Sequence, residues 1–280
     1  MTHSTAAPRR SPTSPPDRRP RRYTTALSKG QGMPDETAAL LRLWEPGMTV
    51  AALKRKAAAS GALGRATALR VEDIVGRVFA DRYLRGEPPA ASHLKTLLEL
   101  GVPWRSLMQL LLLYTARANP VLADFLENVY WRRFAAGALD ITRDHALDFL
   151  TTATAEGAID PPWSDIMMIR VARYLTGCLT EFGLAGPDRA GIRQILPFRL
   201  DDLTALYLAH ELHFSGINDT SLVNHPDWRL FGLEPADVPP HLVRTAGRHF
   251  ILQGAGDLVR IAWQYRSFEE ALRGIAANRF

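Results

Sequence analysis

The chain has 280 residues and a formal net charge of +5, with 46% apolar and 22% charged residues, which is ordinary for a globular protein. Its one cysteine, Cys178, excludes an internal disulfide framework and fits the reducing cytoplasm, where we expect the protein. Residues 1–30 lack the apolar core of a secretory signal, and the longest apolar run, 107–116, is too short to cross a bilayer.

Residues 1–24 are predicted to form a disordered basic tail. They are rich in Pro, Ser and Arg and have almost no large apolar side chains. Such a segment buries too little surface to offset the entropy lost on ordering. Two roles stay open for it, an auxiliary nucleic-acid arm or a solubilising leader.

Residues 49–85 are predicted to fold as a helix, a tight turn and a second helix. Thr49 suits the N-cap position, and Gly61 suits the left-handed position that ends a helix. Apolar residues follow one face of the second helix at helical spacing: Val71, Val75, Val78, Phe79 and Tyr83. A preceding helix, residues 34–44, completes a three-helix unit.

The positive charge of the folded part is concentrated in residues 49–85, which hold eight basic and three acidic residues. Residues 86–280 carry a net charge of −4, so the basic segment stands out and indicates an anionic partner. Arg65 and Arg70 lie near the start of the second helix, where the macrodipole disfavours cations and a phosphate can bind.

This pattern predicts a helix-turn-helix that binds double-stranded DNA through its second helix. A helical hairpin with a solvated basic face is the alternative. The predicted phosphate contacts are Lys54, Arg55, Lys56, Arg65 and Arg77, and Thr67 and Arg70 are the predicted contacts to base edges.

The rest of the chain reads as a helical bundle, because apolar-periodic segments alternate with Gly, Pro and Asn and no internal repeat is visible. Helices are expected at 91–100, 104–117, 120–136, 142–156, 163–184 and 202–214. Core positions are assigned to Leu97, Leu98, Leu107, Leu110, Leu111, Phe125, Val129, Ile166, Ile169 and Leu175. Residues 249–253 and 258–265 predict a β-hairpin, and a short helix follows it.

No coherent catalytic set is visible in the sequence. His210 and His213 flank Glu211 and are spaced to hold a metal, with His225 or Asp219 as a third ligand, but two structural histidines are the stronger interpretation. Cys178 reads as an inert buried thiol. We therefore expect no enzyme, no metal site, no cofactor and no small-molecule substrate.

Several short motifs, concentrated after residue 207, resemble those of a known family. They are Ser28–Gly30, Tyr207–His210, Phe214–Gly216, His225–Trp228, Leu230–Leu233, Leu252–Gln253, Ala255–Ile261, Trp263 and Glu269–Glu270. Together they resemble BrxA, a component of BREX bacteriophage-defence systems. The resemblance implies an N-terminal helix-turn-helix-like region, a body similar to the antitermination factor NusB, and binding of double-stranded DNA without catalysis.

The expected fold is therefore mostly α, with a helix-turn-helix domain at residues 25–88 and a NusB-like bundle with a C-terminal β-hairpin at residues 89–280. The expected function is that of a non-enzymatic, DNA-binding accessory protein of phage defence, with other BREX proteins as further partners. Two alternatives stay open: an RNA-binding or antitermination-like factor, and a protein scaffold whose basic patch meets an acidic partner.

Overall fold

Helices account for most of the chain in the computed structural model, which describes residues 22–255 and 258–277. The only strands among these residues form two short antiparallel pairs. In chain order the elements are η1 Ala26–Lys29, α1 Pro34–Leu43, α2 Val50–Ser60, α3 Ala68–Asp73, η2 Ile74–Phe79, α4 Ala80–Tyr83, α5 Ala90–Glu99, α6 Trp104–Ala118, α7 Pro120–Phe125, η3 Leu126–Tyr130, α8 Trp131–Ala135, β1 Asp140–Thr142, α9 Arg143–Ala155, α10 Asp165–Glu181, β2 Ile192–Gln194, α11 Asp202–Phe214, α12 Asp219–Val223, η4 Pro226–Phe231, α13 Val238–Ala246, β3 Phe250–Ala255, β4 Leu258–Trp263 and α14 Phe268–Ala277. The predicted mostly-α class is confirmed.

The N-terminal helices pack as a unit. The Thr49 hydroxyl accepts a hydrogen bond from the Ala52 amide where α2 begins, and Gly61 follows its last residue with φ of 65°. α3, η2 and α4 continue without a break from Ala68 to Tyr83. Their buried face consists of Val71, Ile74, Val75, Val78, Phe79 and Tyr83, as the periodicity indicates. α2 and α1 both contact this long helix.

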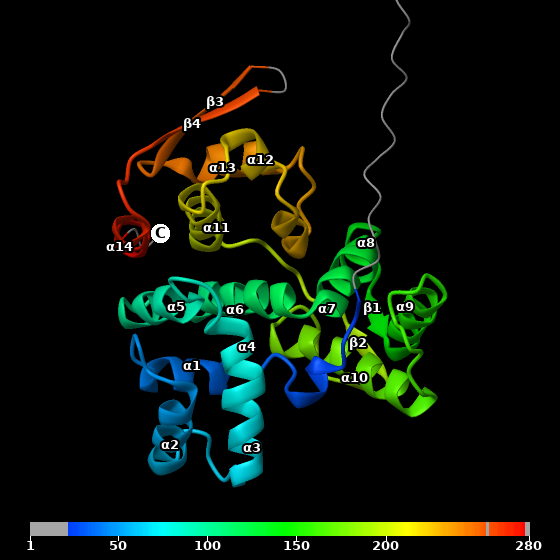
Figure 1. Cartoon of the computed structure of the whole chain (residues 1–280). Helices are drawn as coiled ribbons and strands as arrows, with labels where there is room; N and C mark the ends of the chain where they lie inside the picture. The colour runs from blue at the N-terminus through cyan, green and yellow to red at the C-terminus, as the bar shows by residue number, and fades with distance from the viewer. Residues whose placement is uncertain (1–21, 256–257, 278–280) are drawn as a thin grey trace, which may run out of the picture.

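The pair α5 and α6 forms the middle of the molecule. In Figure 1 these helices cross the centre, with α1–α4 on one side and α11–α14 on the other. The contacts agree, because α5 packs on α1 and α14, and α6 packs on α4 and α11. The apolar run from Leu107 to Ala116 is therefore a core helix, buried along nearly its whole length. Within the described residues, no helix is long and apolar enough to cross a membrane.

The chain crosses from α4 to α5 through residues 86–89, the predicted domain boundary. The segments before and after this turn contact each other through α1 with α5 and through α4 with α6. Their buried apolar side chains belong to one continuous core. The predicted tail lies outside the described residues up to residue 21.

The predicted C-terminal hairpin is confirmed. β3 and β4 pair in register from Phe250 opposite Trp263 to Ala255 opposite Leu258, and the tip residues 256–257 lie outside the described ranges. Phe250 and Ile261 are buried on the helices, whereas Ile251 on the other face is exposed. The hairpin packs on α12 and α13, at the opposite end of the molecule from α2 and α3 (Figure 1). The hairpin is therefore too far from the N-terminal unit to act as the β-hairpin wing that would accompany a winged helix-turn-helix.

Two core assignments on α10 are wrong. Ile166 and Ile169 are 72% and 49% exposed, because α10 turns its other side towards α9 and η1. The buried side instead carries Val171, Ala172, Leu175, Cys178 and Leu179. Helical spacing identifies a stripe only when apolar residues are confined to one face, and α10 has them on both.

Several short elements were missed in the sequence. β1 pairs with β2 across some fifty residues of chain, with Ile141 opposite Arg193. Three-residue strands hold too little alternation to be recognised. The short helix α12 and the helix α13 lie between α11 and the hairpin. Polar and apolar residues are mixed in this stretch, so no helical periodicity stands out.

Replacing Trp263 with alanine should lower the free energy of unfolding by about 3 kcal/mol, the lower end of the range for large aromatics because the indole is partly exposed. The Trp263 ring stacks on His213 with centroids 4.2 Å apart and meets His210 edge-on at 4.9 Å. Urea denaturation measures the loss. Ile251→Ala, on the exposed face of the hairpin, should cost less than about 0.5 kcal/mol. Equal losses would contradict this packing.

Candidate nucleic-acid interface

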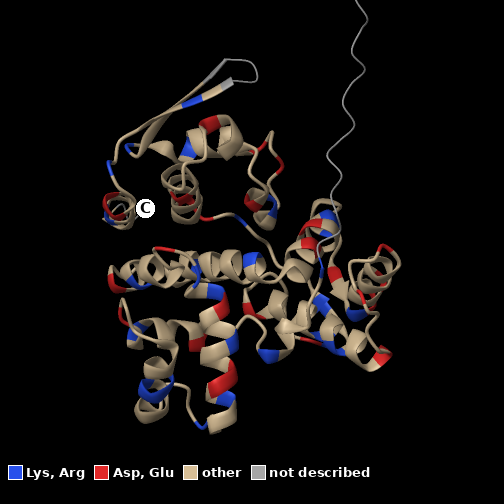
Figure 2. Cartoon of the chain, viewed as in Figure 1, with Lys and Arg blue, Asp and Glu red and all other residues tan. Residues whose placement is uncertain are grey.

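The basic residues of the N-terminal unit are distributed over α2, the connection to α3 and the long helix that follows (Figure 2). In Figure 1 this end of the unit projects from the lower left of the molecule, away from the other layers. The structure divides these basic residues into two groups, those held by intramolecular contacts and those that are free.

On α2, Lys54 and Lys56 are held. Lys54 forms an ion pair with Glu72 on α3, and Gly76 makes room for it, because a Cβ there would lie 3.0 Å from the Lys54 Nζ. Lys56 lies 3.6 Å from the Glu45 carboxylate. Both lysines thus tie α2 to its neighbours, and each carries less uncompensated charge than the sequence indicates.

Arg70 has a structural partner that explains its unfavourable place near a helix start. Its guanidinium donates a hydrogen bond to the Lys29 carbonyl oxygen at 2.6 Å, at the end of η1. Arg77 lies 3.7 Å from Asp73, a carboxylate that Lys29 also approaches to 3.4 Å. Arg70 therefore holds η1 against the long helix, and its position is no longer evidence for a phosphate.

Arg55 and Arg65 form the free group. Both are exposed, and neither has a hydrogen-bond or ion-pair partner in the described part of the chain. Thr67 is exposed and caps α3 by accepting from the Arg70 amide at 3.2 Å. Of the predicted contacts, the structure thus brings Arg65 and Thr67 together at the exposed start of α3.

Leu69 lies at the same end of α3 and was missed in the sequence analysis. Its side chain is 74% exposed, although the opposite face of the helix is buried. The signal was present, because Leu69 lies about 200° from Val71 around the helix and so falls off the apolar stripe. An exposed apolar side chain beside Arg65 and Thr67 can contact a thymine methyl group in a major groove.

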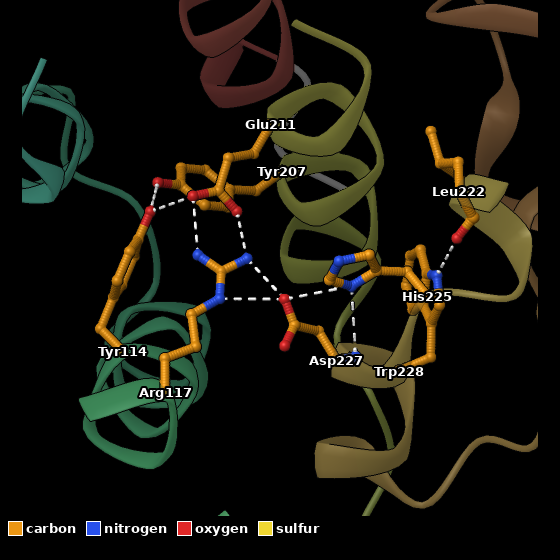
Figure 3. A network of polar contacts seen from close by, with 8 residues as sticks. All are labelled: Tyr114, Arg117, Tyr207, Glu211, Leu222, His225, Asp227 and Trp228. Atoms are coloured by element: carbon orange, nitrogen blue, oxygen red, sulfur yellow. Dashed lines mark hydrogen bonds and ion pairs between the residues drawn. The ribbon is translucent and has the colours of Figure 1, made fainter. Parts of the chain in front are cut away.

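A second polar centre lies in the interior and joins α6, α11 and η4 (Figure 3). The Arg117 guanidinium donates to both Glu211 oxygens, at 2.8 and 2.7 Å, and to Asp227 Oδ2, at 2.9 and 2.7 Å. The Tyr114 hydroxyl donates to Glu211 at 2.6 Å and lies 2.6 Å from the Tyr207 hydroxyl. These contacts connect segments about a hundred residues apart.

The charges in this centre stabilise one another. Burial opposes the charge of Arg117, but hydrogen bonding and attraction from Glu211, together with Asp227, outweigh burial and raise its pKa. Burial also opposes the charge of Asp227, and its contacts with His225 and Arg117 nevertheless lower its pKa. Burial raises the pKa of both Tyr114 and Tyr207, which stay neutral. The centre is a matched set of structural contacts.

The residues considered for a metal are used in packing. His210 is buried, its Nδ1 lies 2.7 Å from the Leu206 carbonyl oxygen, and burial lowers its pKa to about 4. His213 stacks on Trp263, and Asp219 accepts from the Ile261 amide at 2.8 Å. No group of three metal-ligating side chains occurs among the described residues. Cys178 is buried as expected, and burial raises the pKa of its thiol to about 12.

The fold defines a predominantly helical protein with an N-terminal three-helix unit on a two-helix central layer. The chain belongs to the BrxA family, whose model matches residues 21–211. This match covers the N-terminal unit and the central layer, whereas most motifs behind the resemblance lie after residue 207. The family associates the chain with BREX phage defence.

No curated protein matches the sequence. A crystal structure of an uncharacterized protein from Magnetospirillum magneticum is similar in fold, with a TM-score of 0.57 at 15% sequence identity. The similarity covers 76% of this chain and 100% of that chain.

Replacing Arg117 with methionine should destabilise the protein by about 3–5 kcal/mol, because it leaves two buried carboxylates without their cation. Denaturant unfolding measures the loss. As a control, Arg132→Met removes an exposed arginine from α8 and should change stability by less than about 0.5 kcal/mol. An Arg117→Met protein as stable as this control would show that the centre contributes nothing.

Replacing His210 with phenylalanine should reduce the loss of stability in mild acid. The folded pKa is about 4, below the ordinary value of about 6.5, so between these values only the unfolded chain binds the proton. The contribution of the buried, neutral His210 to the free energy of unfolding is complete above pH 6.5 and is lost as the pH falls towards 4. Between pH 7.5 and 5.0 the wild type should lose about 2 kcal/mol more than His210→Phe, measured by urea unfolding at both values. An identical pH dependence would contradict the burial of a neutral imidazole.

Proposed function

We propose that this protein is a non-catalytic, double-stranded DNA-binding accessory of a BREX-type defence system, and that the start of α3 enters the major groove. Family membership supplies the cellular context. The observation that carries the DNA-binding proposal is the exposed cluster of Arg65, Thr67 and Leu69 on the projecting end of the N-terminal unit.

The geometry suits a helix-turn-helix. α2 and α3 are joined by residues 61–67, and the long helix buries one face while its N-terminal end stays exposed. In such units the first residues of the second helix approach base edges, and the preceding helix and turn contact the backbone. Arg55 and Arg65 are free to contact phosphates, and Thr67 and Leu69 are placed to approach bases.

The non-catalytic part of the proposal rests on how the reactive side chains are used. Cys178 is a buried, protonated thiol, and the buried carboxylates Glu211 and Asp227 are both engaged by Arg117. Each group therefore has a packing or pairing role.

The test is the salt dependence of binding to a duplex of random sequence, followed by fluorescence anisotropy. Each lost phosphate contact should reduce the log–log salt slope by about one, so Arg55→Gln with Arg65→Gln should reduce it by about two. Leu69→Ser should change the preference among sequences and leave the slope unchanged. The control is Arg170→Gln with Arg173→Gln, which removes two exposed arginines from α10.

The outcomes separate the alternatives. A control variant that loses as much affinity as the Arg55/Arg65 variant would exclude the α2–α3 end as the binding surface. Tighter binding to structured RNA in direct competition would favour the RNA-binding alternative. No binding to either nucleic acid, with co-purification of defence proteins that survives nuclease, would favour the scaffold. If the tail is an auxiliary arm, removal of residues 1–22 should weaken duplex binding without abolishing it.

A further inference from the structure

A cavity of about 490 Å³ lies between the long helix of the N-terminal unit and the elbow where α6 meets α7. Residues Thr24 and Ala26, leading into η1, form its third wall. Its lining is strongly basic: the arginines are Arg77, Arg82, Arg85 and Arg117, and Asp81 is the one carboxylate among the described lining residues. A cavity of this size accommodates a small ligand or a part of a larger one.

Arg82 lines this cavity and forms no ion pair with an acid of the described residues. The residue is only 6% exposed, and its guanidinium donates to the carbonyl oxygens of Gly30 and Gly32 at 2.6 and 3.0 Å. Both acceptors are neutral, and no carboxylate in the described chain lies within ion-pairing distance of it. Buried charges are normally matched by opposite charge. Arg117, in contrast, is already matched by Glu211 and Asp227.

Arg77 and Arg85 are free to turn towards a ligand. Their side chains are 67% and 76% exposed, and each forms an ion pair within one helical turn, with Asp73 at 3.7 Å and Asp81 at 2.7 Å. Exposed pairs of this kind contribute little to stability. If Arg77 turns away, Asp73 keeps Lys29 at 3.4 Å. If Arg85 turns away, the half-exposed Asp81 returns to water.

We propose that this cavity binds a chain of two or more linked phosphate groups. Arg77 lies in η2 and Arg85 lies just beyond the end of α4, so the two guanidinium groups reach the cavity from separate points of the chain, which suits linked phosphates better than a single ion. The planar guanidinium pairs with two phosphate oxygens at once. Linked phosphates occur in the DNA backbone and in nucleoside polyphosphates. The DNA source rests on the proposed function, because the duplex would then continue along the helix from Arg65 to the cavity.

Calorimetric titration of the full chain with inorganic pyrophosphate, and anisotropy with the random duplex, test the two sources. Arg77→Gln with Arg85→Gln should weaken binding at least tenfold in one of these arms. Asp81→Asn should strengthen it about threefold, because it removes the opposing carboxylate and frees Arg85. A purely structural role for these residues would not produce this pair of opposite effects. Arg170→Gln with Arg173→Gln is the charge-matched control, and circular dichroism verifies that each variant is folded.

Loss of pyrophosphate binding in the Arg77/Arg85 variant assigns the cavity to a free polyphosphate. Loss of duplex binding alone assigns it to the DNA backbone. Equal behaviour of the Arg77/Arg85 variant and the control in both arms overturns the proposal, as does a wild type that binds neither probe. If the wild type binds pyrophosphate but no duplex, the cavity is supported as a polyphosphate site and the proposed DNA binding is refuted.

Discussion

The position of the C-terminal layer depends on Arg117, a single cation on the central helix α6 held between two carboxylates. Glu211 comes from α11 and Asp227 from η4, and both are largely buried with it. An unpaired charge in the interior is strongly destabilising. The three elements α6, α11 and η4 must therefore pack so that Arg117 meets both carboxylates. The Tyr114 hydroxyl adds a hydrogen bond to Glu211 and is itself paired with the Tyr207 hydroxyl. Apolar packing supplies the bulk of the stability, and this contact selects one geometry for it.

The basic residues of the N-terminal unit serve two different purposes. Lys54 and Arg70 hold neighbouring segments in place, one through Glu72 and the other through the Lys29 carbonyl. Arg55 and Arg65 have no such partner in the described chain and face solvent. A charge count treats the four residues as equal, whereas Arg55 and Arg65 can contact an external anion without breaking an existing contact. The surface proposed for DNA is therefore smaller than the basic segment and lies nearer the turn.

The arrangement of the layers limits how the protein meets a duplex. The β3–β4 hairpin lies beyond α12 and α13, far from α2 and α3 in Figure 1, so the N-terminal unit acts without a wing from it. The arginine-lined cavity instead lies beside the unit, where α4 reaches the central layer. An anion there would contact the N-terminal unit and the α6–α7 elbow together.

The sequence by itself determined the fold class, the longer helices and the C-terminal hairpin. Thr49, Gly61 and the spacing of Val71, Val75 and Val78 define the helices of the N-terminal unit, because capping and periodicity act within one or two turns. Tertiary structure decided which charges are free and which faces are covered. Arg70 finds its acceptor 41 residues away and Arg117 finds Glu211 94 residues away, while Ile166 and Ile169 are left exposed. Such pairings depend on how distant segments pack, and local sequence carries no record of that packing.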